Sequence, residues 1–206
     1  MAETEFNVTG FEEATFDRIA LALHTVGYCV IANSLPLALG EALCARVLLV
    51  TGEFKRAGVG RGMVPNADGL IRTDGIRWLS RDDGTETAYL AWMERLRLGL
   101  NRRLFLGLFD YESHFAIYEA GGSYRIHLDA FQGETNRIVS TVFYLNPRWL
   151  PASCGELLIH GSDGILLESV MPDIGTMVIF LSAQFPHQVA ITHRKRYSIA
   201  GWFSGR

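Results

Sequence analysis

The hydrophobic positions in the first half of the chain recur mostly at helical spacing. Apolar residues at intervals of three and four predict helices over residues 11–26, 37–50 and 85–106, and a short strand is expected over 28–32. Gly27 and Gly52 stand where the first two helices would end, and Pro36 favours the start of the second. We expect Arg95, Arg102 and Arg103 of the third helix to be mostly solvated.

The second half of the chain has the alternation of β-strands. After about residue 107 the pattern predicts strands over 113–118, 123–129, 138–145, 156–160, 165–170, 177–181, 187–191 and 196–203. Short strands separated by turn residues predict a sandwich or an antiparallel barrel. We expect one domain over residues 1–206, with 1–107 as mainly helical support and 108–206 as the β core.

A glycine-rich segment, residues 55–78, separates the second and third predicted helices and shows no sustained period. Long irregular segments inside a compact chain are usually functional or disordered. The functional interpretation is a lid loop that grips a substrate through Arg72, Asp74 and Arg77, together with Trp78. The alternative is a connection without a role.

Composition and charge exclude several classes of protein. The 206 residues carry a net charge of −3, which gives no reason to expect a nucleic acid or an anionic membrane as partner. Three widely spaced cysteines without a CxxC pair argue against a disulfide framework and a structural zinc site. An acidic N-terminus and the absence of a long apolar run lead us to expect a soluble, cytoplasmic protein.

The stretch SYRIHLDAF places a histidine and a carboxylate on the same side of a predicted strand. Tyr124, Ile126 and Leu128 fall on one face, which we expect to pack against the rest of the fold. His127 and Asp129 fall on the other face, where an imidazole nitrogen and a carboxylate oxygen could both bind a metal. By itself this pair is weak, because a surface histidine beside a surface aspartate gives the same pattern.

A second group of residues near the C-terminus strengthens the metal interpretation. His187 opens one predicted strand, and Arg196 opens the next, with Ser198 two residues later. Two histidines and one carboxylate form the facial triad that holds non-haem Fe(II) with open positions for substrate and oxygen. An arginine at the far end of such a pocket could bind a dicarboxylate through two hydrogen bonds.

These motifs resemble those of the Fe(II)- and 2-oxoglutarate-dependent dioxygenases, and among them the prolyl hydroxylases related to the oxygen-sensing enzymes of animals. The resemblance covers about residues 109–203 and includes the segments TVFYLN and AIYEAGGSYRIHLD. It implies that His127, Asp129 and His187 bind iron, that Arg196 and Tyr144 bind the 5-carboxylate of 2-oxoglutarate, that Tyr118 lines the co-substrate pocket, and that Arg137 and Trp202 border the substrate. Tyr118 is one residue nearer to the histidine than in the animal enzymes, and Ala200 replaces a threonine.

The resemblance also implies a fold and a reaction. We expect an α+β protein with a double-stranded β-helix (jelly-roll, cupin-like) core and the N-terminal helices packed on one sheet. Fe(II), 2-oxoglutarate and O2 would be required, with ascorbate helping to maintain activity. The segments DGIRWL and YLAWMERLR also resemble bacterial prolyl hydroxylases that act on elongation factor Tu, which implies a protein substrate with an exposed prolyl loop. The alternatives are an oxygenase of a small molecule, such as a free amino acid, and a cupin-like binding module without activity.

Overall fold

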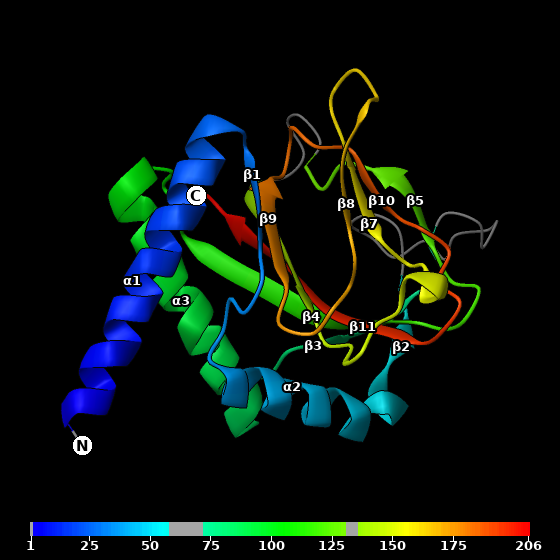
Figure 1. The fold of residues 1–206 in the computed structure, drawn as a ribbon, viewed down its shortest axis with the longest axis horizontal. Helices are drawn as coiled ribbons and strands as arrows, with labels where there is room; N and C mark the ends of the chain where they lie inside the picture. The colour runs from blue at the N-terminus through cyan, green and yellow to red at the C-terminus, as the bar shows by residue number, and fades with distance from the viewer. Residues whose placement is uncertain (1, 58–71, 131–135) are drawn as a thin grey trace.

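The computed structural model of the chain describes residues 2–57, 72–130 and 136–206. Its helices are α1 (Ala2–Thr25), α2 (Leu37–Leu49) and α3 (Gly84–Leu104), with short 3-10 turns η1 (Thr51–Glu53) and η2 (Pro151–Ser153) (Figure 1). The three predicted helices are therefore confirmed, although the first begins at Ala2 rather than at residue 11. No helix among the described residues combines the length and the apolar character that a membrane crossing would require.

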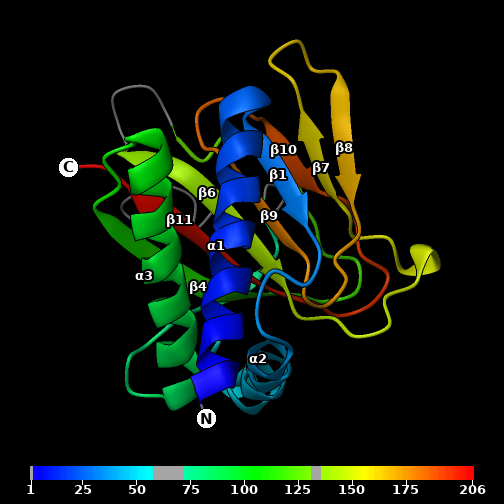
Figure 2. The ribbon, with the colours of Figure 1, turned by 60° about the vertical axis from the view of Figure 1, so that its left-hand side comes forward.

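The strands form two antiparallel sheets. The larger has the order β1 (Tyr28–Ile31), β9 (Met177–Leu181), β6 (Arg137–Tyr144), β11 (Arg196–Ser204), β4 (Asp110–Tyr118), β3 (Gly75–Trp78) and β2 (Lys55–Arg56). The smaller has the order β5 (Tyr124–His127), β10 (His187–Val189), β7 (Leu157–His160) and β8 (Leu166–Val170), and it lies on the side of the larger sheet away from the helices (Figure 2). All eight predicted strands of the second half are present, and the core is the expected double-stranded β-helix.

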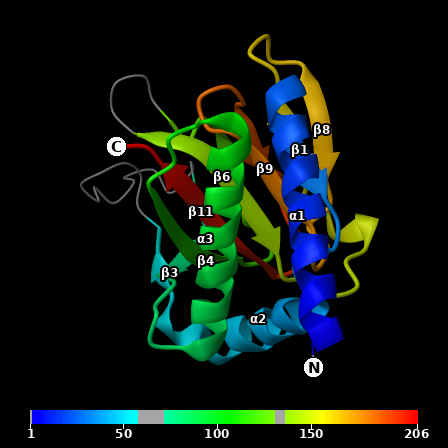
Figure 3. The same cartoon turned by 90° about the vertical axis from the view of Figure 1, so that its left-hand side faces the viewer.

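Each face of the larger sheet is covered by its own hydrophobic layer. Helices α1 and α3 run side by side over the outer face, and α2 crosses near their ends (Figure 3). The outer core contains Phe16, Leu43, Trp92, Phe143 and Ile179. The core between the two sheets contains Tyr118, Tyr144, Ile159, Phe180 and Val189. Because strand residues alternate between these layers, β4, β6 and β11 supply packing residues outward and Tyr118, Tyr144 and Arg196 inward.

The charged side chains of α3 tie the helical layer together. Two arginines that were predicted to be solvated form ion pairs with acidic residues of α1. Arg95 Nη2 lies 2.8 Å from Glu12 Oε1, and Arg103 Nε lies 2.6 Å from Asp17 Oδ1. The expectation of solvated side chains was wrong for Arg103, whose side chain is 20% exposed. Each ion pair of this kind contributes little to the free energy of unfolding. Together they join α3 to α1.

The glycine-rich segment is partly ordered at its ends. Residues 58–71, most of the predicted lid loop, lie outside the described residues. On either side of them, β2 and β3 pair with each other, and β3 also pairs with β4. These two strands were missed because sequences of two and four residues are too short to show a period-two pattern. The C-terminal part of the segment, residues 72–78, therefore extends the larger sheet through β3. It also brings Arg72 next to Tyr124 of the smaller sheet.

Candidate active site

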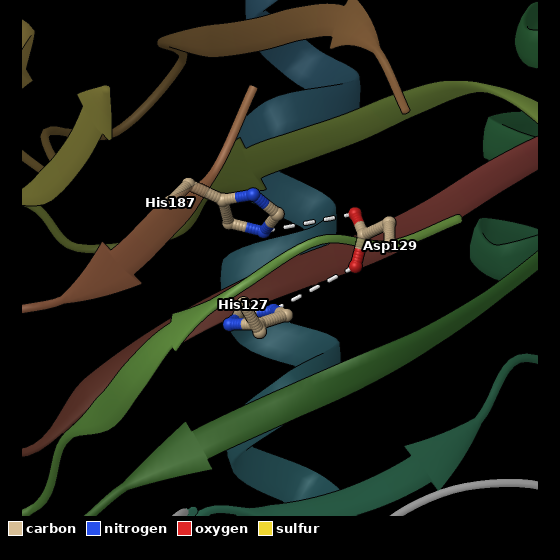
Figure 4. Close-up of side chains that lie close together, drawn as sticks. All are labelled: His127, Asp129 and His187. Atoms are coloured by element: carbon tan, nitrogen blue, oxygen red, sulfur yellow. Dashed lines mark ion pairs between the residues drawn. The ribbon is translucent and has the colours of Figure 1, made fainter. Parts of the chain in front are cut away.

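The three residues of the predicted metal triad lie together, at the end of β5 and the start of β10. His127 closes β5 and faces His187, the first residue of β10, in direct register, and Asp129 lies in a bend two residues after His127. Nε2 of His127 lies 3.7 Å from Oδ1 of Asp129, and Nε2 of His187 lies 3.7 Å from Oδ2 (Figure 4). One ligand atom from each residue falls within 4.8 Å of the others, so the three side chains could hold a single ion.

Backbone contacts set the orientation of both imidazoles. Nδ1 of His127 lies 2.8 Å from the carbonyl oxygen of Arg125, and Nδ1 of His187 lies 3.0 Å from that of Phe185. Since a carbonyl only accepts, each Nδ1 carries the proton and each Nε2 presents a lone pair. Burial, followed by repulsion from His187, lowers the pKa of His127 to about 4. His127 is therefore neutral at pH 7, as metal binding requires.

The carboxylate of Asp129 is ionised despite its burial. Burial raises its pKa, but His187, His127 and a 2.7 Å hydrogen bond from Ser140 Oγ to Oδ2 lower it, and the net result is a pKa below the ordinary value. Two neutral nitrogens and one anionic oxygen are the donor set suited to Fe(II) with open coordination positions. The residues present therefore fit such an ion.

A second group of buried polar atoms lies on the larger sheet. The side chain of Arg196, which is 1% exposed, donates from Nε to the carbonyl oxygen of Gly155 at 2.9 Å and from Nη1 to Ser198 Oγ at 3.5 Å. Among the residues that the structure describes, its buried Nη2 has no hydrogen-bond partner, and neither has the buried hydroxyl of Tyr144. Buried polar groups rarely stay unpaired. The missing partner is best supplied by an anionic ligand that binds both atoms.

Aromatic rings enclose this cationic group. The guanidinium carbon of Arg196 lies 5.0 Å from the ring centroid of Tyr144 and 5.2 Å from that of Tyr118. Burial raises the pKa of Tyr144 to about 12, so its hydroxyl stays protonated and can donate to an anion. The predicted co-substrate residues Arg196, Tyr144 and Tyr118 are thus brought together, and they fit one carboxylate of a dicarboxylate.

Tyr124 does not lie where the alternation of SYRIHLDAF predicted it. Its ring stacks on that of His127, with centroids 3.7 Å apart and planes at 18°. The pairing of β5 with β10 contains a bulge, since Val189 opposes Tyr124 while His187 opposes His127. The extra residue shifts Tyr124 onto the same side as His127. Ile126, expected to pack with it, is instead exposed.

The structure places five of the six predicted substrate residues in two groups, and the sixth, Arg77, away from both. Trp78 packs edge-on against the ring of His114, which in turn contacts the ring of Trp202. Arg137 stacks over the ring of Trp202, with 3.8 Å between its guanidinium carbon and the centroid. Arg72 binds the buried carboxylate of Asp74 through two hydrogen bonds of 2.6 and 2.7 Å. Its guanidinium lies 4.9 Å from the centroid of the Tyr124 ring, the ring that covers His127.

Arg77 lies on the opposite side of the sheet. On β3 it opposes Phe115, which belongs to the outer core, and its guanidinium pairs with Glu53 and with the buried Glu86 of α3. The structure therefore does not bring Arg77 to the other site residues, because strand alternation turns it toward the helices. Arg46 binds the same Glu86 carboxylate at 2.8 Å, which completes a buried ionic cluster.

Sequence reasoning missed two residues that the structure brings to the triad. Ser140, on β6, donates to Asp129, and Ser182 lies 2.9 Å from it, Oγ to Oγ. The polar pair Ser140 and Thr141 inside the largely apolar strand segment IVSTVF was the available signal, and Ser140 is the one that faces the triad. No comparable pattern pointed to Ser182, which directly follows β9.

Comparisons with known proteins agree with this geometry. Residues 113–204 match the model of the 2OG-Fe(II) oxygenase superfamily. Human prolyl hydroxylase EGLN3 is 26% identical over 202 residues, which cover 93% of this chain and 84% of that protein. A crystal structure of a Pseudomonas putida prolyl-4-hydroxylase is 38% identical with a TM-score of 0.84 and covers 93% of this chain and 99% of that one.

A further solved structure shares the fold. The prolyl hydroxylase from Trichoplax adhaerens, in complex with a peptide fragment of the hypoxia inducible factor oxygen degradation domain, is 24% identical with a TM-score of 0.82, covering 97% of this chain and 92% of that one. The combination of a double-stranded β-helix, a His-Asp-His triad, a buried arginine and a 38% identical relative over nearly the whole chain leads to one family. The chain belongs to the 2OG-Fe(II) oxygenase superfamily and is a 2-oxoglutarate-dependent dioxygenase of the prolyl hydroxylase type.

Proposed function

We propose that this dioxygenase hydroxylates a prolyl residue in a protein substrate, with elongation factor Tu as the candidate protein. The reaction would consume 2-oxoglutarate, O2 and a prolyl C–H bond, and would produce succinate, CO2 and a prolyl C–OH group. The observation that carries the proposal is a pair of buried donors on the larger sheet, Arg196 Nη2 and Tyr144 OH, that find no partner among the described residues, together with a triad suited to Fe(II) whose histidines belong to the smaller sheet.

The residues of the two sheets have separate roles in this proposal. His127, Asp129 and His187 bind the metal, which, when bound, supplies the oxygen activation that couples decarboxylation to hydroxylation. Arg196 and Tyr144 bind the distal carboxylate of 2-oxoglutarate, and Tyr118 lies against the Arg196 guanidinium. Charge-assisted hydrogen bonds from a rigid fork orient the co-substrate as well as binding it. The burial of these groups excludes water from the reacting atoms.

The prolyl substrate is supported by the relatives and by the site entrance. Two of the solved relatives are prolyl hydroxylases, and one of these is in complex with a peptide fragment of the hypoxia inducible factor oxygen degradation domain. Arg137 lies over the ring of Trp202, and Arg72, paired with Asp74, lies over the Tyr124 ring that stacks on His127. A flat aromatic ring beside paired charges can contact both a pyrrolidine ring and the polar backbone around it.

Mass spectrometry of candidate substrates tests the proposal. The purified protein, Fe(II), 2-oxoglutarate and ascorbate are incubated with purified elongation factor Tu, with a bacterial lysate, and separately with free proline. We expect a prolyl peptide to gain one oxygen atom, at a rate that matches succinate formation. The His187→Ala variant is the control and should produce neither. Succinate formation with oxygen gained only by free proline, or by no protein, would refute the protein substrate.

A further inference from the structure

Asp129 is the member of the triad that no strand ladder holds. His127 and His187 oppose each other in the β5–β10 pair, and both are further fixed by backbone carbonyls. Asp129 lies in a bend two residues after the end of β5, outside the pairing of β5 with β10. Its carboxylate therefore depends on side-chain contacts for its orientation.

The contact that anchors it comes from the opposite sheet. Ser140 Oγ donates to Asp129 Oδ2 at 2.7 Å, and Ser140 Oγ lies 2.9 Å from Ser182 Oγ. Both serines are buried, with exposed fractions of 1% and 0%. Ser140 belongs to β6 of the larger sheet, whereas Asp129 follows β5 of the smaller sheet. The hydrogen bond thus joins the two sheets at the triad.

Proton counting fixes the direction of both hydrogen bonds. An ionised carboxylate only accepts, so the single hydroxyl proton of Ser140 must point to Asp129. Ser140 can then only accept from Ser182, whose own proton must point to Ser140. Hydrogen bonds arranged in one direction strengthen each other, and the chain ends on the anionic oxygen.

We propose that Ser140 is a positioning residue for the metal-binding carboxylate of Asp129, and that Ser182 acts through Ser140. This inference rests on the metal site of the proposed function. Partners of metal ligands hold the ligand in the orientation that binds the ion, and their loss typically weakens metal binding by about 10- to 100-fold. Ser140 holds one carboxylate oxygen, which limits rotation of the group and leaves the other oxygen free of that bond.

Titration with Mn(II) tests the proposal without turnover. The metal-free protein is titrated with Mn(II), and free Mn(II) is measured by electron paramagnetic resonance. We expect Ser140→Ala to weaken binding by about 10- to 100-fold, Ser140→Thr to restore most of the affinity, and Ser182→Ala to have a smaller effect. The double variant should match Ser140→Ala alone, because Ser182 has no route to Asp129 once Ser140 is gone.

Ser113→Ala is the matched control. Ser113 is also a buried serine of the larger sheet, on β4, and its hydroxyl has no hydrogen-bond partner among the described residues. Its removal should leave Mn(II) affinity unchanged. The free energy of unfolding is measured for every variant in the presence of a chelator, so that a general loss of stability is separated from a loss of metal binding.

The outcomes separate this inference from the function on which it rests. No binding of Mn(II) by the unmodified protein would overturn the metal site itself. If the unmodified protein binds Mn(II) and Ser140→Ala binds it with the same affinity, only the role of Ser140 is refuted. Additive losses in the double variant would overturn the action of Ser182 through Ser140. If Ser140→Ala does not fold, the other two variants decide. Equal Mn(II) affinities of Ser182→Ala and Ser113→Ala would refute the chain of hydrogen bonds from Ser182 through Ser140 to Asp129.

Discussion

Replacement of Arg196 by alanine should separate co-substrate binding from metal binding. The guanidinium is buried, and its Nη2 has no hydrogen-bond partner in the described part of the chain. The same holds for the hydroxyl of Tyr144, on the adjacent strand. A carboxylate bound here would lose its charged partner in the variant. Truncation of one member of a buried, hydrogen-bonded charge pair costs about 2–5 kcal/mol.

This cost converts into a large change in affinity. Since about 1.4 kcal/mol corresponds to a factor of ten, we expect the apparent KM for 2-oxoglutarate to rise by about 30-fold to a few thousand-fold. The apparent affinity for Fe(II) should change much less, because the triad lies on the other sheet. Tyr144→Phe removes one hydrogen bond to a charged group, worth about 1.5–3 kcal/mol, and should raise the same KM by about 10- to 150-fold.

Two titrations in one assay measure both quantities. Succinate formation is followed against 2-oxoglutarate at saturating Fe(II), and then against Fe(II) at the highest usable 2-oxoglutarate concentration. Arg196→Lys is the conservative variant: it keeps the charge but loses the planar fork, so its KM should lie between those of the native and alanine proteins. Equal changes in the two apparent constants would refute the assignment of Arg196 to the co-substrate.

Three further predictions concern the stability of the fold. Arg77→Met should lower the free energy of unfolding by about 1–3 kcal/mol in urea denaturation, because the buried Glu86 carboxylate loses one of its two arginine partners and keeps Arg46; an unchanged free energy of unfolding, as for many surface ion pairs, would contradict this. Burial, followed by repulsion from Arg72, lowers the pKa of His114 from 6.5 to about 4. Between pH 4 and 6.5 the unfolded chain therefore binds more protons than the folded protein. The contribution of His114 to the free energy of unfolding is complete above pH 6.5 and falls by about 3 kcal/mol as the pH drops to 4. His114→Gln should flatten that part of the stability profile, and an unchanged slope would exclude His114 as its cause. Gly201→Ala should destabilise by about 1–3 kcal/mol, since the new Cβ would collide with the hydroxyl of Tyr111; an unchanged Tm would show that this ring moves freely.

The sequence predicted the elements better than their details. Alternation and turn residues were sufficient for the eight strands of the second half, and helical spacing was sufficient for three helices. Strands β2 and β3 were missed because they are short and obtain their hydrogen bonds from each other and from β4 rather than from an apolar pattern. A pairing partner distant in sequence leaves no local signal.

The site shows the same limit at the level of single residues. The two histidines could be grouped by motif, but their direct register across β5 and β10 depends on tertiary structure. Tyr124 was assigned to the wrong face because one bulge residue reverses the alternation on which the assignment relied. Ser140 and Ser182 become recognisable only when two sheets bring their hydroxyl groups to Asp129.

The division of the site between the two sheets has a consequence for substrate choice. The histidines of the triad belong to the smaller sheet, and Arg196 and Tyr144 belong to the larger one, so the sandwich fixes the span between them. Facing sheets keep a nearly constant separation, set by the packed side chains between them. Under the roles proposed above, that separation selects a co-substrate by its length. A dicarboxylate that reaches from the metal triad to Arg196 and Tyr144 is accepted, and a shorter one such as oxaloacetate is disfavoured.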